Sequence, residues 1–287
     1  MNNTYNIEGA DHEVHHNQLF MKDPNYYPEF PQHLEKFKTQ IQDQVNNNEG
    51  KSYVHFGDGD YHFLKQEGIG SASPGKRALS VPYNKIDIQR FRDGWNKADY
   101  HCVEYFENMR PKLQELYPGQ KTIPTEFLYG LTASRWFTKQ FKGKIGLIGA
   151  GEKMDLIKEL LTHKEYQDYL RLEDFNDYIK IPQKFACDNL DNTIQVIKEQ
   201  LENADPETKI YLYGVGHVKS GLMHHLPSFK KALYIDVGAG IDGLAGLLDF
   251  RRPYAKAWVN YRLKNYDYSK IDLLGYNIQI DNNLKFL

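Results

Sequence analysis

The sequence predicts an α/β protein with a Rossmann-like, mostly parallel sheet, flanking helices and a helical lobe. From residue 143 onward, short apolar strands alternate with helical segments, which is typical of parallel sheets built from strand–helix–strand units. Three of these strands end in closely spaced glycines, which permit tight turns from strand to helix. They are Gly149-Ala150-Gly151, Gly214-Val215-Gly216 and Gly238-Ala239-Gly240.

The composition favours a globular protein and excludes several classes. Of the 287 residues, 40% are hydrophobic, which is enough for a sizeable core. Lys and Arg number 36 against 38 Asp and Glu, and this balance argues against a nucleic-acid-binding protein, which usually has a basic surplus. No apolar run approaches the roughly 20 residues of a membrane-spanning helix. Because Cys102 and Cys187 are the only cysteines and no signal peptide is evident, we expect a cytoplasmic protein.

Residues 1–31 predict an irregular N-terminal arm, and residues 32–287 predict a single α/β domain. The arm is polar, aromatic and punctuated by proline. It contains His12-Glu13-Val14-His15-His16, which matches the H-E-x-x-H pattern of zinc proteases. That pattern needs both histidines on one helix face, and the flanking residues show no sustained helical period. A solvated polar arm is therefore the favoured interpretation.

The remaining elements follow from apolar periodicity and from turn residues. An amphipathic helix is expected over residues 33–45 and a β-rich strand over 52–56, which pairs into the sheet or packs beside it. Residues 68–77 form a loop, and the tail from residue 249 forms a closing strap. The other expected elements are helices 86–117 and 124–141 (the lobe), strand 144–150, helix 154–161, strand 178–182, helix 192–201, strand 209–216, helix 217–226, strand 232–240 and helix 241–248.

The first candidate for chemistry is the run Gly57-Asp58-Gly59-Asp60, which follows the strand over 52–56. The two glycines let the backbone turn and approach a ligand closely. The two carboxylates repel each other, and a bound cation best explains such a pair. Oxygen ligands of this kind suit Mn²⁺ or Mg²⁺ rather than zinc. The alternative is an Asp-Gly hairpin turn with solvated aspartates.

The run F-G-D-G-D-Y, followed by a polar stretch rich in Gly, Ser, Lys and Arg, resembles the F-G-D-G-E signature of the GT-D-type glycosyltransferases. In that family a D-x-E motif helps to hold a divalent metal against the diphosphate of a sugar nucleotide. The resemblance implies that Asp58 and Asp60 bind Mn²⁺ or Mg²⁺, with Asp60 in place of the family's Glu. It also implies transfer of a sugar from a nucleoside-diphosphate sugar to a hydroxyl acceptor, in glycan or polysaccharide synthesis.

Other residues would serve the same reaction. Gly57 and Gly59 would allow close approach, and Asp60 would assist catalysis through the metal. Lys76 and Arg77 end the loop over 68–77 and could neutralise phosphates, although a solvated basic loop is an equal alternative.

The glycine turns predict a nucleotide site. The βα turns of parallel strands lie at one edge of a sheet, where ligands bind near helix N-termini. We therefore expect Gly149, Gly151 and Gly216 to contact the nucleotide. His217 follows Gly216 and could bind a phosphate or act as an acid or base, while a capping or partly buried histidine is the alternative. The chain has neither a complete G-x-G-x-x-G pattern nor a Walker motif, which disfavours dehydrogenases and kinases.

Asp236 closes an apolar strand and is the candidate for the base that deprotonates the acceptor, with Asp242 as a second candidate. The same stretch, Ile235 to Gly240, also resembles the first motif of S-adenosylmethionine-dependent methyltransferases. That motif normally opens its domain, whereas here 47 residues follow Gly240. A third alternative is a non-catalytic carbohydrate-binding domain.

Overall fold

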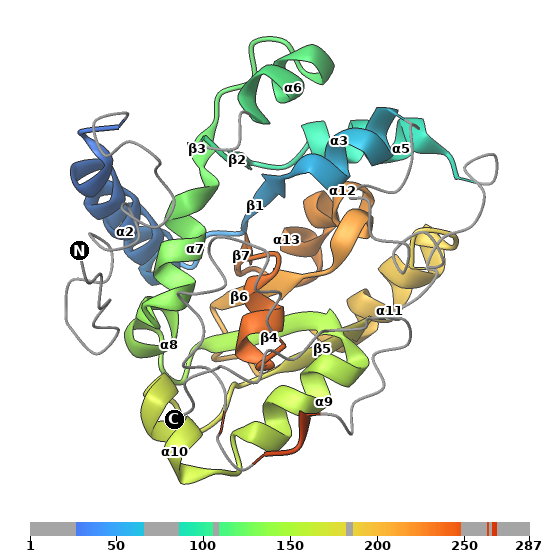
Figure 1. The fold of residues 1–287 in the computed structure, drawn as a ribbon. Coiled ribbons are helices and arrows are strands. Elements are labelled where there is room, and N and C mark those ends of the chain that lie inside the picture. The colour runs from blue at the N-terminus through green and yellow to red at the C-terminus, as the bar shows by residue number, and fades with distance from the viewer. Residues whose placement is uncertain are drawn as a thin grey trace.

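The computed structural model describes residues 27–65, 86–105, 109–181, 186–247, 263 and 266–268. Within them, seven strands form one sheet in the order β3-β2-β1-β7-β6-β4-β5, and every neighbouring pair is parallel (Figure 1). The predicted α/β class with a Rossmann-like sheet is therefore confirmed. The strands are β1 (Lys51–Phe56), β2 (Tyr100–Val103), β3 (Ile123–Pro124), β4 (Ile145–Ala150), β5 (Tyr178–Ile181), β6 (Ile210–Gly214) and β7 (Leu233–Asp236).

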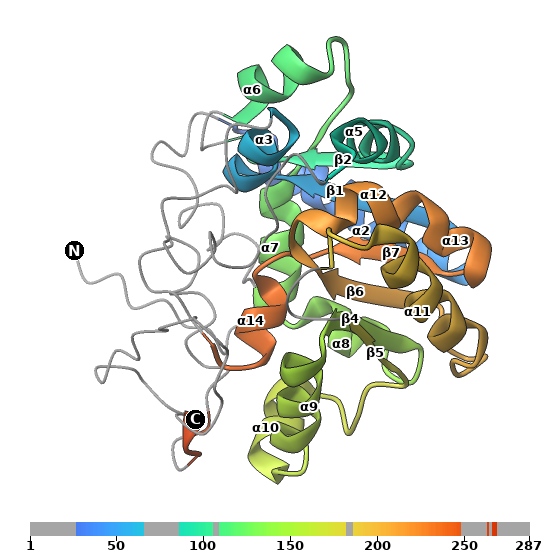
Figure 2. The ribbon, with the colours of Figure 1, turned by 90° about the vertical axis from the view of Figure 1, so that its right-hand side faces the viewer.

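Helices cover both faces of the sheet, and α7 and α14 lie on the opposite side of β6 and β7 from α11 and α13 (Figure 2). The first face carries α2 (Phe30–Asn46), α7 (Thr125–Ala133), α8 (Trp136–Gln140), α9 (Gly151–Leu160), α10 (Lys164–Leu170) and α14 (Gly240–Leu244). The second face carries α3 (Asp58–Lys65), α5 (Ile88–Asn96), α6 (Met109–Leu116), α11 (Leu190–Glu202), η3 (Gly216–Val218), α12 (Lys219–Leu222), η4 (Met223–His225) and α13 (Leu226–Phe229).

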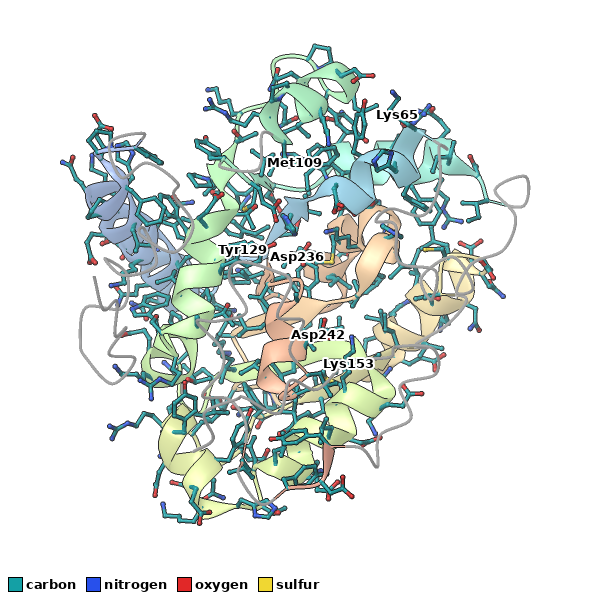
Figure 3. All side chains as sticks on the ribbon, viewed as in Figure 1. Lys65, Met109, Tyr129, Lys153, Asp236 and Asp242 are labelled. Atoms are coloured by element: carbon teal, nitrogen blue, oxygen red, sulfur yellow. The ribbon has the colours of Figure 1, made fainter. Side chains whose placement is uncertain are left out.

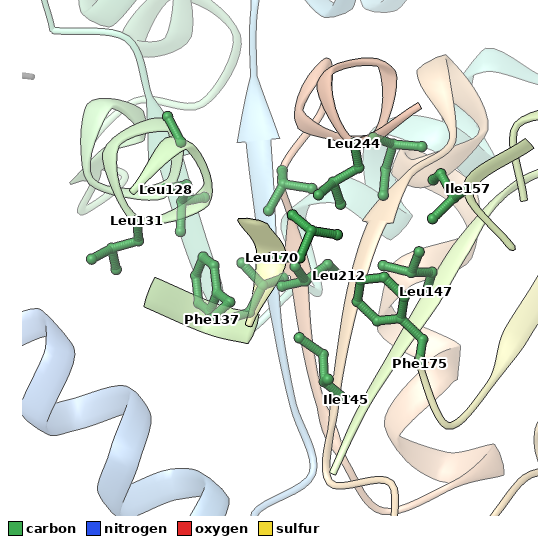
Figure 4. Close-up of a cluster of buried hydrophobic side chains, with 14 of the residues drawn as sticks. Leu128, Leu131, Phe137, Ile145, Leu147, Ile157, Leu170, Phe175, Leu212 and Leu244 are labelled. Carbon is green, nitrogen blue, oxygen red and sulfur yellow. The ribbon is translucent and has the colours of Figure 1, made fainter. Parts of the chain in front are cut away.

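Each face has its own core because side chains alternate along the strands. Leu147 and Leu212 point to the first face, where they pack among the apolar residues drawn in Figure 4. Ile148 and Tyr213 point to the second face. All four are at most 1% exposed. Burying a side chain of this size stabilises the fold by about 1.5–3 kcal/mol, so the continuous apolar runs of the central strands hold both helical layers to the sheet.

The run expected as a metal loop is the beginning of a helix, so the prediction of a loop was wrong. The carbonyl oxygen of Gly57 accepts hydrogen bonds from the backbone N of Asp60 and of Tyr61, both at 3.1 Å. Helix α3 starts at Asp58, and both aspartates lie in its first turn. Acidic side chains are stabilised there by the positive end of the helix dipole. This favourable position accounts for two close carboxylates without a hairpin.

The expected helix over residues 86–117 also differs. It contains α5, the strand β2 and α6. Residues of β2 pair with β1 in register, for example His101 with Val54. The aromatic and apolar spacing near Tyr100 fits a helical period, and the strand becomes evident from its pairing with β1 and β3. The expected helix over 124–141 is interrupted at Arg135, whose backbone is left-handed with φ of 61°.

The strand order positions the site. The neighbours β1 and β7 lie at the centre of the sheet, and the chain leaves β1 into α3 on the second face and β7 into α14 on the first. In open parallel sheets, ligands bind at the carboxyl edge where the chain turns away in opposite directions. Tyr53 and Ile235 are the last residues that β1 and β7 pair with each other. Beyond them the backbone N of His55 donates to Oδ2 of Asp236 at 3.0 Å.

Candidate functional site

The three glycine turns meet at the carboxyl edge, as predicted. Gly149 and Gly214 are register partners on β4 and β6. A Cβ on Gly214 would lie 2.4 Å from the carbonyl oxygen of Gly238, and a Cβ on Gly149 would lie 2.8 Å from Cε of Met154. The contact at Gly149 is with the end of a flexible side chain, which can shift, whereas the contact at Gly214 is with the backbone. Gly214 is therefore needed for close packing of the turns.

Gly151 and Gly216 are different, because they leave space. A Cβ on Gly151 would meet only the flexible side chain of Lys180, at 3.8 Å, and Gly151 opens helix α9. A Cβ on Gly216 would have no neighbour within 4 Å among the described residues, and its φ of +62° suits glycine. Of the glycines expected to contact a nucleotide, Gly151 thus tolerates an added Cβ, and Gly216 has open space beside it among the described residues.

A buried lysine joins the two candidate catalytic acids. Nζ of Lys219, from α12, lies 2.9 Å from Oδ2 of Asp60 and 3.0 Å from Oδ2 of Asp236. The three residues are between 1% and 5% exposed. Each carboxylate also accepts a backbone hydrogen bond. The N–H of Gly57 donates to Oδ2 of Asp60 and that of Gly238 donates to Oδ1 of Asp236, each at 2.9 Å. This cluster, the Lys219 triad, fixes α3, α12 and the turn after β7 to one another.

The triad is held in its charged form. Burial alone would raise the pKa of Asp60, but Lys219 and then His217 outweigh it and keep the pKa well below its ordinary value. Burial alone would lower the pKa of Lys219, but Asp236 and Asp60 raise it above its ordinary value. Asp60 is therefore ionised and Lys219 protonated at neutral pH, and the lysine is the cation of this site.

His217 lies beside the triad, at the edge where it was expected. Its Nδ1 is 3.5 Å from Oδ1 of Asp60, and its ring stacks on that of Phe63 with centroids 4.9 Å apart. The side chain is 20% exposed, more than that of Asp60 or Lys219. His217 is thus the member of this group most accessible to a ligand that approaches the turn at Gly216.

The two aspartates of the predicted metal pair are not equivalent. Asp60 is engaged by Lys219, whereas Asp58 is exposed, with Oδ1 accepting a hydrogen bond from N of Gly59 at 2.7 Å. No group of three or more His, Cys, Asp or Glu side chains is arranged to hold a metal within the described residues. Asp58 fits the manner in which Mg²⁺ is commonly held, by one or two carboxylates and the phosphate oxygens of a substrate. A metal shared by both aspartates stays a prediction.

A second polar cluster lies on the first face of the sheet, next to the triad. Nε2 of His55, from β1, is 3.4 Å from the hydroxyl of Tyr129 and 3.6 Å from Oε1 of Glu104. The Tyr129 hydroxyl donates to Oε1 of Glu104 at 3.0 Å. Tyr129 comes from α7 and is labelled in Figure 3, close to Asp236 in that view. We call this group the His55 cluster.

Asp242, the second candidate base, takes part in another ion pair. Its Oδ1 lies 2.5 Å from Nζ of Lys153, as can be followed in Figure 3. Lys153 is in the first turn of α9, two residues after Gly151, and its side chain is 11% exposed. This pair links α9 to α14 across the glycine turns. Asp242 is thus separate from the Lys219 triad.

Sequence reasoning missed Lys219, the buried cation of the site. Lys219 stands among small and apolar residues in V-K-S-G-L, and a lysine in that setting signals burial with a partner. His55 gives a similar signal within the apolar strand Y-V-H-F. Glu104 and Tyr129 carry no comparable signal. Lys76, Arg77 and the histidines of residues 12–16 lie outside the described residues.

Comparisons with known proteins leave the family open. The chain matches no protein-family model, no curated protein and no solved structure. Within its described part, none of the helices has the length and apolar character needed to cross a membrane.

Proposed function

We propose that this protein is a glycosyltransferase that moves a sugar from a nucleoside-diphosphate sugar to a hydroxyl acceptor. One observation supports the proposal most directly. Gly151 and Gly216, where an added Cβ would not clash, lie at the same edge of the parallel sheet as the Lys219 triad and His217. Nucleotides bind at this edge in such sheets. The resemblance of residues 56–61 to the GT-D-type signature supports the sugar as the transferred group.

In this proposal the diphosphate lies over the turn at Gly216. Backbone N–H groups at the start of a helix favour phosphate, and Gly151 opens α9 at the same edge. His217 contacts a phosphate oxygen, because its ring is partly exposed and fixed against Phe63. Asp58 would hold Mn²⁺ or Mg²⁺. When bound, such an ion supplies positive charge to the diphosphate leaving group.

Asp60 and Asp236 act in this proposal as positioning residues. Oδ2 of Asp236 pairs with Lys219 and accepts a hydrogen bond from the backbone N of His55. Oδ1 of Asp236 accepts a hydrogen bond from the backbone N of Gly238. A carboxylate with its lone pairs so occupied and 1% exposed is a poor proton acceptor. Asp236 instead fixes the turn that begins at Gly238. Asp60 fixes the start of α3, which carries Asp58.

A thermal-shift screen tests the proposal. The protein is heated with a panel of nucleoside-diphosphate sugars, with the free nucleotides and with S-adenosylmethionine, each with and without Mn²⁺. A ligand at 100 times its Kd stabilises the folded state by about 2.7 kcal/mol, which shifts the melting temperature by several degrees. We expect one sugar nucleotide to give the largest shift. A shift with S-adenosylmethionine alone would support the methyltransferase alternative, and a shift with free glycans alone would support the carbohydrate-binding one.

A further inference from the structure

Two glycines lie along the Cε1 edge of the His55 ring. Nδ1, at one end of that edge, lies 3.5 Å from the position that a Cβ on Gly238 would take, and Cε1 and Nε2 lie 3.3 and 3.5 Å from the corresponding position on Gly57. Within the described residues no hydrogen bond reaches Nδ1. Neither glycine has a side chain to cover this edge. The ring therefore presents Nδ1 at the point where the turns after β1 and β7 come together.

Hydrogen bonding in the His55 cluster fixes where the imidazole proton sits. The Tyr129 hydroxyl has one proton and donates it to Glu104. The two oxygens that face Nε2 of His55 are therefore both acceptors, and Nε2 must carry the N–H. In the neutral ring this leaves Nδ1 with a free lone pair. Glu104 then stabilises the ring when Nδ1 takes up a proton, as a carboxylate does for a catalytic histidine.

The position of His55 is tied to the Lys219 triad. Its backbone N donates to Asp236, whose side chain also holds N of Gly238. Asp236 thus sets the distance between Nδ1 and the turn at Gly238, while Lys219 and Asp60 lie on the other face. A ligand at this edge would find phosphate-binding groups on one face and a proton acceptor on the other.

We propose that His55 is the general base of the transfer reaction, an inference that rests on the proposed function. Nδ1 accepts the proton of the acceptor hydroxyl as its oxygen bonds to the anomeric carbon of the donor sugar. The bond from that carbon to the diphosphate oxygen breaks, and its electron pair leaves with the nucleoside diphosphate. His55 then releases the proton to solvent. Glu104 and Tyr129 are positioning residues, because they act through the ring.

The test compares His55→Gln with His101→Gln in the full-length chain. His101 is a matched control, because it is a buried histidine on the adjacent strand whose two ring nitrogens contact O of Trp95 at 2.9 Å and Nε2 of Gln120 at 2.7 Å. We expect His55→Gln to bind the sugar nucleotide with unchanged Kd by calorimetry and to lose about 100-fold or more in kcat. His101→Gln should keep the wild-type kcat.

Glu104→Gln supplies a readout that a merely structural role would not change. Without the carboxylate the protonated ring loses the partner that stabilises it in the transition state, so kcat should fall while the Kd of the sugar nucleotide stays unchanged. Glu104→Asp should restore part of the lost kcat. In the wild type, nitrogen-15 NMR of the histidine rings should show His55 with its proton on Nε2. The NMR measurement tests the proton assignment even if His55→Gln does not fold.

Three results would overturn the inference. A folded His55→Gln with wild-type kcat would remove His55 as the base but leave glycosyl transfer intact. An Nδ1–H form of His55 would contradict the proton assignment on which the base role depends. Failure of the wild type to bind any sugar nucleotide would instead remove the proposed function, and the base role with it.

Discussion

Nζ of Lys219 lies 2.9 Å from Oδ2 of Asp60, and both side chains are almost completely buried. The lysine comes from α12 and the aspartate from the first turn of α3, so the ion pair joins two segments far apart in the chain. With Asp236 on its other side, Lys219 neutralises one of two carboxylates that would otherwise repel each other. The stability of the site should therefore depend on this one cation.

Removing the cation should destabilise the protein. Lys219→Met leaves Asp60 and Asp236 buried without their partner, and breaking a buried ion pair in this way costs about 3–5 kcal/mol. Urea denaturation followed by circular dichroism measures the change. Lys142→Met, which removes an ion pair with the exposed Glu173, is the control and should leave the denaturation midpoint nearly unchanged. Equal midpoints for the two variants would contradict the assigned role of Lys219.

The glycines of the turns should divide into two classes. Gly214→Ala places a Cβ 2.4 Å from the carbonyl oxygen of Gly238, so the variant should lose about 1–3 kcal/mol of stability or fail to fold. Gly151→Ala meets only the side chain of Lys180 at 3.8 Å and should fold with an unchanged melting temperature. Under the proposed function, Gly151→Ala should nevertheless weaken binding of the sugar nucleotide. Equal melting temperatures for the two variants would contradict the division.

The two aspartates of α3 should respond differently to substitution. Asp58→Asn removes an exposed carboxylate, so the melting temperature should stay within about 1 °C while the Mn²⁺ concentration for half-maximal activity rises. Asp60→Asn removes a partner of Lys219, so the melting temperature should fall at every Mn²⁺ concentration. Titration of Mn²⁺ in the transfer assay, with EDTA-treated protein as the zero point, measures the first effect. An unchanged Mn²⁺ requirement in Asp58→Asn would exclude it as a ligand.

His224 should make the fold sensitive to mild acid. Burial, followed by the charges of His225, Lys97 and Arg90, lowers its pKa to about 4. The ordinary pKa of histidine is about 6.5, so the unfolded chain binds this proton first as the pH falls. The neutral ring makes its full contribution to the free energy of unfolding above pH 6.5, and this contribution is lost as the pH falls toward 4. With allowance for solvent screening of this half-buried group, it amounts to about 1–2 kcal/mol.

The measurement is the melting temperature between pH 7 and pH 4. His224→Phe keeps a ring against Gly94, whose added Cβ would lie 3.0 Å from Cε1 of His224, but cannot be protonated. Its melting temperature should fall less steeply with acid than that of the wild type. His163→Gln alters an exposed histidine and should follow the wild-type curve. Parallel curves for wild type and His224→Phe would show that another group causes the acid sensitivity.

The fold could be predicted largely because its signals are local. Strand–helix alternation with glycine turns indicated the parallel sheet, and the same pattern placed Gly149, Gly214 and Gly238 at one edge, where they meet. The strand β2 was missed because its four residues form a strand through pairing with β1, which local periodicity does not encode. Helix α3 was missed because Gly57 and Gly59 suggested a turn.

The site was predicted in part. Asp60, Asp236 and His217 do lie together, because each lies at or shortly after the end of a strand at the same edge of the sheet. Their partner Lys219 was not identified, since the sequence gives no sign that a helix after β6 points its lysine back between two other strand ends. The cluster of His55, Glu104 and Tyr129 likewise depends on three elements brought together by the complete fold. The sequence alone therefore did not predict the contacts between segments that are far apart in the chain.

The adjacency of β1 and β7 determines when the site can form. The ribosome makes β7 only after β1 to β6, so the nascent chain carries one open edge of β1 until β7 emerges. Closing so long a loop is entropically costly and slow. Asp60 remains hydrated until Lys219 and Asp236 arrive. The centre of the sheet can therefore be completed only after β7 is made, and a ligand bound there would contact segments that lie far apart in the chain.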